Sequence, residues 1–122
     1  MTASDCLFCR IVAGEIPATV VRETPTALAF RDINPQASTH VLVVPKSHHP
    51  DVVALAKAEP EALAEVFAVA GEVAEAEGIA EGGYRLLFNT GADAGQTVFH
   101  AHLHLLGGEW LGGLVGGALP PA

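Results

Sequence analysis

The sequence predicts an α+β fold, with a mainly antiparallel five-stranded sheet, one long helix and a short N-terminal helix. Short β-branched or alternating apolar runs, bounded by turn residues, occur on both sides of one long helical pattern. A parallel sheet needs repeated helical crossovers, and the chain has too few helices for them. At 122 residues, half of them hydrophobic, the chain is long enough for one domain with its own core.

The first 45 residues are expected to form the short helix and three strands. The helix is marked by apolar residues at helical spacing: Leu7, Phe8, Ile11 and Val12. Strands are predicted at residues 20–23 and 28–31, joined as a hairpin, and at residues 40–44, a β-branched run ended by Pro45.

The long helix is expected over residues 59–77, where apolar side chains recur on one side and glutamates fill the other. The glutamates are interpreted as a solvated helix face. Gly78 or the Gly82-Gly83 pair is expected to end the helix, and strands follow at 84–89 and 100–106. Residues 1–108 then make up a single domain. Residues 109–122 form a Gly/Pro-rich C-terminal tail, expected to be mobile, with Trp110 as its bulky anchor.

The net charge of −8 argues against nonspecific binding to nucleic acid or to an anionic membrane. No segment is apolar enough for a membrane span, and the N-terminus lacks the basic and apolar regions of a signal peptide. The two cysteines form a single C-x-x-C without a disulfide framework. We therefore expect a cytoplasmic protein.

Three histidines alternate near the C-terminus, at His100, His102 and His104. In an extended strand their rings would share one face, with neighbours about 6–7 Å apart. Such a set can ligate a metal, or can supply a nucleophile and a partner for a phosphate. Histidines that only face solvent on a strand, without a chemical role, are the less favoured interpretation, because half of the six histidines fall within five residues.

Two features leave alternatives open. Cys6 and Cys9 form half of a zinc site, a redox pair or two unligated thiols, although a thioredoxin-like role would need a βαβ setting. A cupin-like metalloenzyme could use His102, His104 and Glu109 as ligands, but the long helix does not suit a small jelly roll.

His100-Ala-His-Leu-His-Leu-Leu resembles the H-φ-H-φ-H-φ-φ signature of the histidine triad (HIT) nucleotide-binding proteins, where φ is apolar. Separate matches occur in the same order at residues 30–48, 83–86, 95–98 and 107–108. The resemblance covers residues 6 to about 108 and is greatest to the adenosine phosphoramidase (HINT-like) branch.

The resemblance implies a hydrolase that cleaves purine nucleoside phosphoramidates, conjugates of AMP or GMP, at the α-phosphate. His102 would be the nucleophile and would form a nucleotidyl-histidine intermediate. The backbone carbonyl of His100 would fix its tautomer. His104 would bond the α-phosphate, and His40 would support the triad from a neighbouring strand.

The resemblance also implies a nucleotide site. Phe8, Ile11 and Ile33 would line the base pocket, while Asp32 would bind ribose hydroxyls. The phosphate would meet donors from four residues: Asn89, Gly95, Gln96 and Thr97. Taken alone, Asp32 is a turn residue and residues 89–97 are an ordinary hairpin loop. Thr97 departs from the serine of many relatives, which puts the leaving-group pocket in doubt.

By resemblance, a structural zinc is held by four residues: Cys6, Cys9, His48 and His100. His49 competes with the adjacent His48, and the chemistry itself needs no metal. The family also implies a homodimer. Residues 109–117 depart from the tryptophan-proline ending of many relatives, so the leaving group is undetermined. A dinucleoside polyphosphate hydrolase and a nucleotide sensor with incidental turnover remain alternatives.

Overall fold

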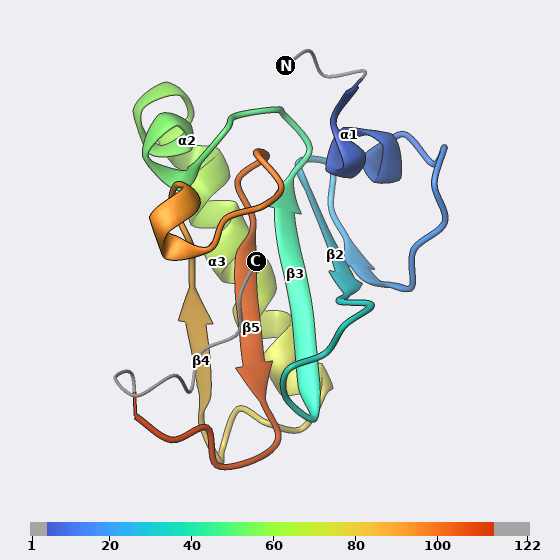
Figure 1. Ribbon diagram of the computed structural model, residues 1–122. Helices are drawn as coiled ribbons and strands as arrows, with labels where there is room; N and C mark the ends of the chain where they lie inside the picture. The colour runs from blue at the N-terminus through green and yellow to red at the C-terminus, as the bar shows by residue number, and fades with distance from the viewer. Residues whose placement is uncertain (1–4, 114–122) are drawn as a thin grey trace.

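A computed structural model describes residues 5–113 and shows one five-stranded antiparallel sheet in the order β1-β2-β3-β5-β4 (Figure 1). The strands are β1 (Val20–Glu23), β2 (Ala27–Arg31), β3 (Thr39–Pro45), β4 (Tyr84–Leu87) and β5 (Leu103–Gly107). The helices are α1 (Leu7–Val12), α2 (Val52–Ala58) and α3 (Pro60–Ala76), and a 3-10 turn, η2, spans Ala92–Ala94. The predicted fold class is confirmed.

The long helix α3 crosses one face of the sheet and covers the larger core cluster (Figure 1). Its buried residues recur at helical spacing, so they form one stripe: Val66, Val69, Ala70, Val73 and Ala74. Alternate residues of the neighbouring strands β3 and β5 pack against this stripe, among them Val41, Val43, Leu103 and Leu105. The period-2 pattern of the strands and the helical pattern of α3 therefore specify the same core.

The opposite face of the sheet carries a second, smaller core cluster, in which α1 packs through Phe8 against Phe30 and Leu42. Strand β3 is buried along its whole length because both of its faces are covered. Its residues alternate between the two clusters, so His40 and Leu42 lie on the α1 side. This face positions the candidate site.

The C-terminal end of α3 is attached to the sheet by an ion pair and a close contact. Arg31, at the end of β2, donates two parallel bonds to the carboxylate of Glu77, with N–O distances of 2.8 and 2.9 Å. Bidentate geometry of this kind fixes orientation as well as distance. Ile79 packs on Gly107 so closely that an added Cβ would lie 2.7 Å from its Cδ1 atom.

The first four predicted strands overlap the observed ones, and the predicted long helix is longer by one residue at each end. The last strand begins at Leu103 rather than at residue 100, because the segment before it leaves the sheet ladder. Helix α2 was not predicted. The Asp51 side chain caps it by accepting a bond from the Ala54 amide at 2.8 Å.

The chain beyond β5 lies partly within the described residues. Glu109 accepts bonds from the backbone and hydroxyl of Ser38, and Arg85 donates to the Gly112 carbonyl at 2.8 Å. Trp110 is 89% exposed, so in the single chain it anchors nothing. Residues 114–122, which hold most of the predicted mobile tail, lie outside the described residues. Within residues 5–113, no helix is long and apolar enough to cross a membrane.

Candidate functional site

Three histidines meet on the α1 side of the sheet, at the junction of the two central strands. His104 lies in β5 opposite Leu42 of β3, and His102 lies just before β5. The rings of His102 and His104 have centroids 5.1 Å apart, and His40 lies at the same distance from His104. All three are buried, and burial of a polar ring costs free energy unless its nitrogen atoms form hydrogen bonds or bind a ligand.

His102 has a defined tautomer. Its Nδ1 atom lies 2.8 Å from the backbone carbonyl oxygen of His100, and a carbonyl only accepts, so Nδ1 carries the proton. The other ring nitrogen, Nε2, then keeps a lone pair. Burial lowers the pKa of His102 below its ordinary value, partly opposed by the bond to the carbonyl. His102 is therefore a neutral imidazole with one free basic nitrogen.

A chain of hydrogen bonds fixes the protons of the next two rings. The backbone N–H of Gln36 donates to Nδ1 of His40 at 3.1 Å, so the proton of neutral His40 sits on Nε2. That nitrogen lies 2.9 Å from Nδ1 of His104 and donates to it. His104 must therefore carry its own proton on Nε2, and this atom is buried without a partner. A buried, unpaired N–H donor beside His102 is suited to an incoming anionic oxygen.

The pKa of His104 is lowered to about 3, first by burial and then by the neighbouring His102 and His40. Burial also lowers the pKa of His40, and the Asp32 carboxylate opposes that shift at 3.4 Å from Nε2. All three rings are thus neutral near neutral pH. Asp32, His40 and His104 could together hold a metal by proximity alone. The 2.9 Å contact between the two rings is instead a hydrogen bond, which takes up both nitrogen atoms.

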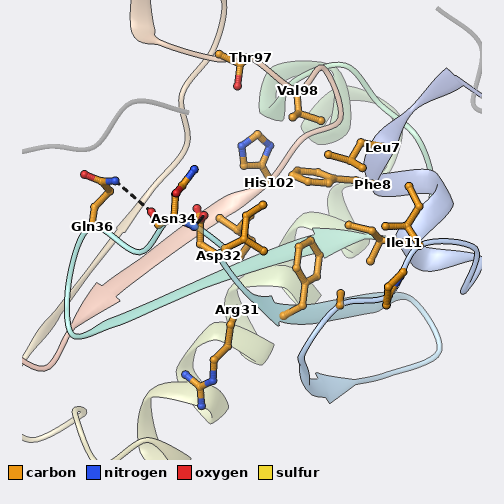
Figure 2. Close-up of a pocket in the computed structure, with 16 residues that line it drawn as sticks. Leu7, Phe8, Ile11, Arg31, Asp32, Asn34, Gln36, Thr97, Val98 and His102 are labelled. Atoms are coloured by element: carbon orange, nitrogen blue, oxygen red, sulfur yellow. Dashed lines mark hydrogen bonds between the residues drawn. The ribbon is translucent and has the colours of Figure 1, made fainter.

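A cavity of about 480 Å³ opens beside His102, between α1 and the sheet (Figure 2). This volume is in the usual range for small-molecule sites. Its apolar wall comes from several elements: Leu7, Phe8, Ile11, Ile16, Pro17, Ala18, Phe30, Ile33, Leu42 and Val98. The ring of Phe8 meets the ring of His102 edge-on, with centroids 5.0 Å apart. An apolar, flat ligand would therefore bind next to the free nitrogen of His102.

The predicted nucleotide-binding residues fall into two groups. Six of them line the cavity: Phe8, Ile11, Asp32, Ile33, Thr97 and His102. The hydroxyl of Thr97 points toward His102 in Figure 2. His104 is absent from the cavity lining and lies beside His102, with ring centroids 5.1 Å apart. Asn89, Gly95 and Gln96 are outside the cavity lining, and the Gln96 side chain is buried and bonded to backbone groups.

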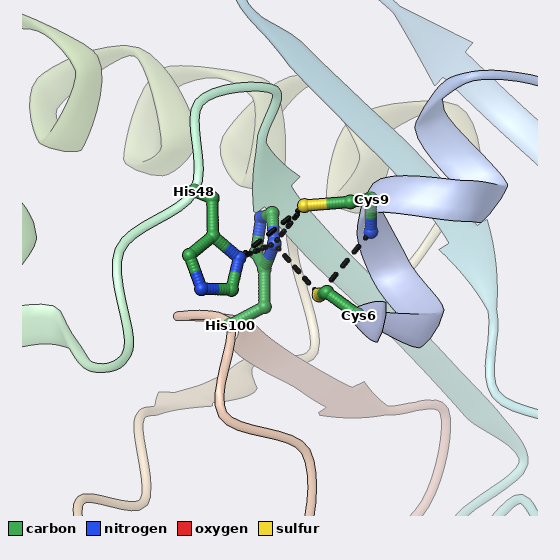
Figure 3. Close-up of side chains that lie close together, drawn as sticks. All are labelled: Cys6, Cys9, His48 and His100. Carbon is green, nitrogen blue, oxygen red and sulfur yellow. Dashed lines mark hydrogen bonds between the residues drawn. The ribbon is translucent and has the colours of Figure 1, made fainter. Parts of the chain in front are cut away.

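A second cluster lies where the N-terminus of α1 meets the segment before β5. The sulfur atoms of Cys6 and Cys9 each lie 3.4 Å from Nδ1 of His100 (Figure 3). Nδ1 of His48 lies 3.3 Å from the Cys9 sulfur and 3.3 Å from Nδ1 of His100. The ring of the adjacent His49 turns away and contacts the Glu59 carboxylate. His48, and not His49, therefore belongs to the cluster.

The four ligand atoms lie within 4.8 Å of one another, and four of their six separations are close to those of a tetrahedral metal site. With ordinary zinc bond lengths, two nitrogens of a tetrahedron lie about 3.4 Å apart, and a nitrogen and a sulfur about 3.6 Å. The observed separations of 3.3–3.4 Å are close to these values. Nε2 of His100 donates to the Pro45 carbonyl at 2.8 Å, which leaves Nδ1 with the lone pair that a metal needs.

Without a cation, the Cys9 thiol and the His100 ring are both neutral. Burial, and then the neighbouring Cys6, raise the pKa of the Cys9 thiol to about 11. Burial lowers the pKa of His100 to about 4, so its ring is neutral. A bound cation deprotonates a coordinating thiol despite such a shift. The other reading, two unligated thiols that donate to the imidazoles, uses the same four residues.

Several groups at the site were not predicted from the sequence. The Gln36 amide and the Pro45 carbonyl set the tautomers of His40 and His100, and backbone groups carry no residue-specific signal. Leu42 and Val98 line the cavity without having been predicted to do so. Leu42 could have been found, since in a strand it shares a face with His40.

Comparisons with known proteins agree with this geometry. Residues 13–110 match the HIT domain. The chain is 46% identical over 110 residues to a purine nucleoside phosphoramidase of Escherichia coli, covering 90% of this chain and 92% of the relative. It is 49% identical over 109 residues to a 14 kDa zinc-binding protein of Zea mays, covering 87% and 84%.

Among solved structures, a HIT family hydrolase from Clostridium thermocellum superposes with a TM-score of 0.89 at 45% identity, covering 93% of this chain and 99% of that one. The sequence match, the shared fold and the run of three histidines agree. The chain therefore belongs to the HIT domain family.

Proposed function

We propose that this protein hydrolyses purine nucleoside phosphoramidates at the α-phosphate, through a covalent intermediate on His102. One observation carries the proposal: His102, whose Nε2 is free, lines the cavity, and the buried N–H of His104 beside it has no acceptor among the described residues. An α-phosphate supplies both an electrophile for the first group and an oxygen for the second.

In the first step, the lone pair of His102 Nε2 forms a bond to phosphorus while the bond from phosphorus to the leaving amine breaks. The amine keeps that electron pair and takes up a proton, for which we assign the Thr97 hydroxyl, in the cavity lining, as the donor. The His104 N–H meets the phosphoryl oxygen as charge develops on it. Water then attacks phosphorus and gives a proton back to the Thr97 oxygen, while the bond from phosphorus to Nε2 breaks and His102 leaves as a neutral ring with its lone pair restored.

The cavity accounts for the nucleoside. A purine base would lie between Phe8, Ile11 and Ile33, and the Asp32 carboxylate would accept bonds from the ribose hydroxyls. Similarity to a purine nucleoside phosphoramidase supports this substrate class. Asn89 and Gly95 remain predicted phosphate-binding residues in this proposal, whereas both side-chain N–H groups of Gln96 are already bonded to the carbonyls of Pro50 and Val98.

The charges around the cavity favour a phosphoramidate over a dinucleoside polyphosphate. Among the described residues, Arg31 is the one Lys or Arg in the cavity lining, and Glu77 holds its guanidinium. A polyphosphate would bring several charges to a chain of net charge −8. The cupin-like alternative does not fit residues 5–113, which form a single five-stranded sheet and not a jelly roll, and Glu109 is bonded to Ser38.

We further propose a structural zinc held by Cys6, Cys9, His48 and His100. When bound, it would join α1 to the start of the triad segment, and no step of the reaction uses it. Similarity to a zinc-binding protein supports the assignment. Cysteines that are not joined in a disulfide and serve as metal ligands are typical of a reducing compartment, so we propose a cytoplasmic location.

A homodimer is proposed as well. The edge strand β4 and the neighbouring surface expose large apolar side chains, including Phe67 and Tyr84. Exposed apolar surface beside a strand edge favours association with a second copy.

The test of the proposed function is His102→Ala assayed with an adenosine phosphoramidate. We expect kcat/KM to fall by at least about 1,000-fold, since the nucleophile is lost. His49→Ala is the matched control, because its ring contacts Glu59 outside the cavity and its activity should be unchanged. Mass spectrometry of quenched enzyme should find the nucleotidyl group on His102.

Retained turnover in His102→Ala would contradict the assignment of the nucleophile. A nucleotide sensor is distinguished by comparison of nucleotide affinity with the single-turnover rate. Tight binding with a single-turnover rate close to the uncatalysed rate would support the sensor and overturn the hydrolase.

A further inference from the structure

Gln96 is a buried amide that lies next to the candidate site without entering it. Its side chain is 4% exposed, and it is absent from the lining of the nucleotide cavity. The next residue, Thr97, does line that cavity, together with His102. Gln96 therefore occupies the position from which a side chain can act on the site through its neighbour.

The Gln96 amide joins three backbone groups, which we call the Gln96 bridge. Its Oε1 atom accepts a bond from the Gly91 amide at 2.8 Å. Its Nε2 atom donates to the carbonyl of Pro50 at 2.7 Å and to that of Val98 at 3.0 Å. A glutamine amide has two N–H donors, so neither is left for a phosphate.

The bridge connects the loop of residues 91–98 to a distant part of the chain. Pro50 follows His48 and His49 and precedes the capping residue of α2. A second bond links the same regions, from the Ala101 amide to the His49 carbonyl at 2.8 Å. Thr97 and its neighbours up to His100 are thus held between two attachments to residues 49–50.

We infer that Gln96 is a positioning residue, which places the Thr97 hydroxyl over His102 through this bridge and does not contact the nucleotide. The inference rests on the proposed function, since it assumes that Thr97 meets the leaving group. Figure 2 shows the Thr97 hydroxyl pointing toward His102, with Val98 beside it.

Glutamate is the informative substitution at this position. In Gln96→Glu the carboxylate still accepts from the Gly91 amide, but it cannot donate to Pro50 or Val98. Two carbonyls lose their donor, and the ionised carboxylate lies against them. The variant therefore keeps the size of the side chain and removes the attachment of the loop to Pro50.

The kinetic test compares Gln96→Glu, Thr97→Val and the double variant on an adenosine phosphoramidate. We expect Gln96→Glu to lower kcat by about 10- to 100-fold, as for a displaced reacting group. The affinity for AMP should change less than about threefold, since the base pocket lies on other elements. The double variant should fall short of the product of the two single effects by about tenfold.

Val69→Ala is the control for a loss of stability alone. Val69 is buried in α3 on the far face of the sheet, so its truncation should lower the melting temperature and leave kcat unchanged. The positioning role is overturned if Gln96→Glu keeps its kcat, or if the effects of the two substitutions simply multiply. Weaker AMP binding at unchanged kcat would overturn it too, by making Gln96 a phosphate ligand.

A second readout needs no turnover, so it separates this inference from the proposed function. In Gln96→Ala, hydrogen exchange of the Gly91 amide should accelerate, because its acceptor is gone. The Ala101 amide, bonded to His49, should exchange as in the wild type. Unchanged exchange at Gly91 overturns the bridge, whereas a wild-type enzyme without phosphoramidate turnover overturns only the proposed function.

Discussion

His100 takes part in two sites through different atoms. Its ring Nδ1 lies among Cys6, Cys9 and His48. Its backbone carbonyl accepts a hydrogen bond from the protonated Nδ1 of His102. The ring can therefore belong to a metal while the carbonyl sets the tautomer of the nucleophile. The bond from Nε2 of His100 to the Pro45 carbonyl fixes the orientation that allows both.

The buried neutral ring of His104 predicts a loss of stability in mild acid. Its pKa is about 3 in the folded chain and 6.5 when unperturbed. Below pH 6.5 this ring binds a proton in the unfolded chain but stays neutral in the folded chain. The free energy of unfolding therefore falls as the pH drops from 6.5 toward 3. One such group lowers it by about 1.4 kcal/mol between about pH 7.5 and 5.5.

Urea unfolding at these two pH values checks this, with His104→Asn as the comparison. In the variant, the free energy of unfolding should change by about 1.4 kcal/mol less between the two pH values, because the ring that takes up a proton only in the unfolded chain has been removed. An NMR titration should find the His104 ring neutral at about pH 5. A ring that titrates near its ordinary pKa would contradict the buried hydrogen-bond chain.

Single residues differ in how far the sequence predicts them. The three alternating histidines are visible as a pattern, and their crowding already indicates chemistry. The choice between His48 and His49 is not visible, since it depends on which ring faces Cys9 after the turn. The hydrogen bonds of Gln96 cannot be predicted from the sequence either, because its partners are backbone groups of Gly91, Pro50 and Val98.

Helix α1 links the two candidate sites as an element. Cys6 caps its first turn by accepting a bond from the Cys9 amide at 3.3 Å, and both sulfurs face His100. Phe8, between them, packs on the His102 ring and on Phe30. A six-residue helix is too short to be stable alone, so its position depends on these side-chain contacts.

Removal of the proposed zinc should therefore loosen the nucleotide pocket. We expect Cys6→Ala and His48→Ala each to lose bound zinc, to lower the melting temperature by about 5 °C or more, and to raise KM more than they lower kcat. His49→Ala is the matched control and should retain zinc, since its ring contacts Glu59.

Metal analysis and thermal unfolding of the purified variants provide the measurements. Zinc that remains in Cys6→Ala would point to a site elsewhere in the chain. A reaction that stops completely on treatment with a chelator, while nucleotide affinity is kept, would show that the metal acts in the chemistry and not in the structure.

The strands and α3 could be predicted from the sequence because one face of each is apolar at the matching period. Helix α2 follows a capping aspartate, Asp51, and is rich in alanine, so the sequence carries a signal for this helix as well. The position of β5 between β3 and β4 depends on pairings far apart in the chain, such as Leu42 with His104. Sequence periodicity does not specify such partners.

Over the whole molecule, most positive side chains are paired, including Arg31 at the cavity. All six Lys and Arg residues lie within the described residues, and four of them pair with glutamates: Arg10, Arg22, Arg31 and Lys46. Arg85 donates to the Gly112 carbonyl. The proposed phosphate partners are the neutral His104, the Thr97 hydroxyl and backbone amides, which suit one negative charge better than several.

This distribution predicts selection by substrate charge. We expect kcat/KM for an adenosine phosphoramidate to exceed that for diadenosine tetraphosphate by at least about 100-fold near 0.05 M salt, because each further phosphate meets an acidic protein without a counter-charge. Raising NaCl to about 0.5 M shortens the screening length and should reduce the ratio, mainly through a lower KM for the tetraphosphate. A kinetic panel at the two salt concentrations measures both effects. Equal kcat/KM values, or a ratio that grows with salt, would mean that a cationic group reaches the phosphates in solution.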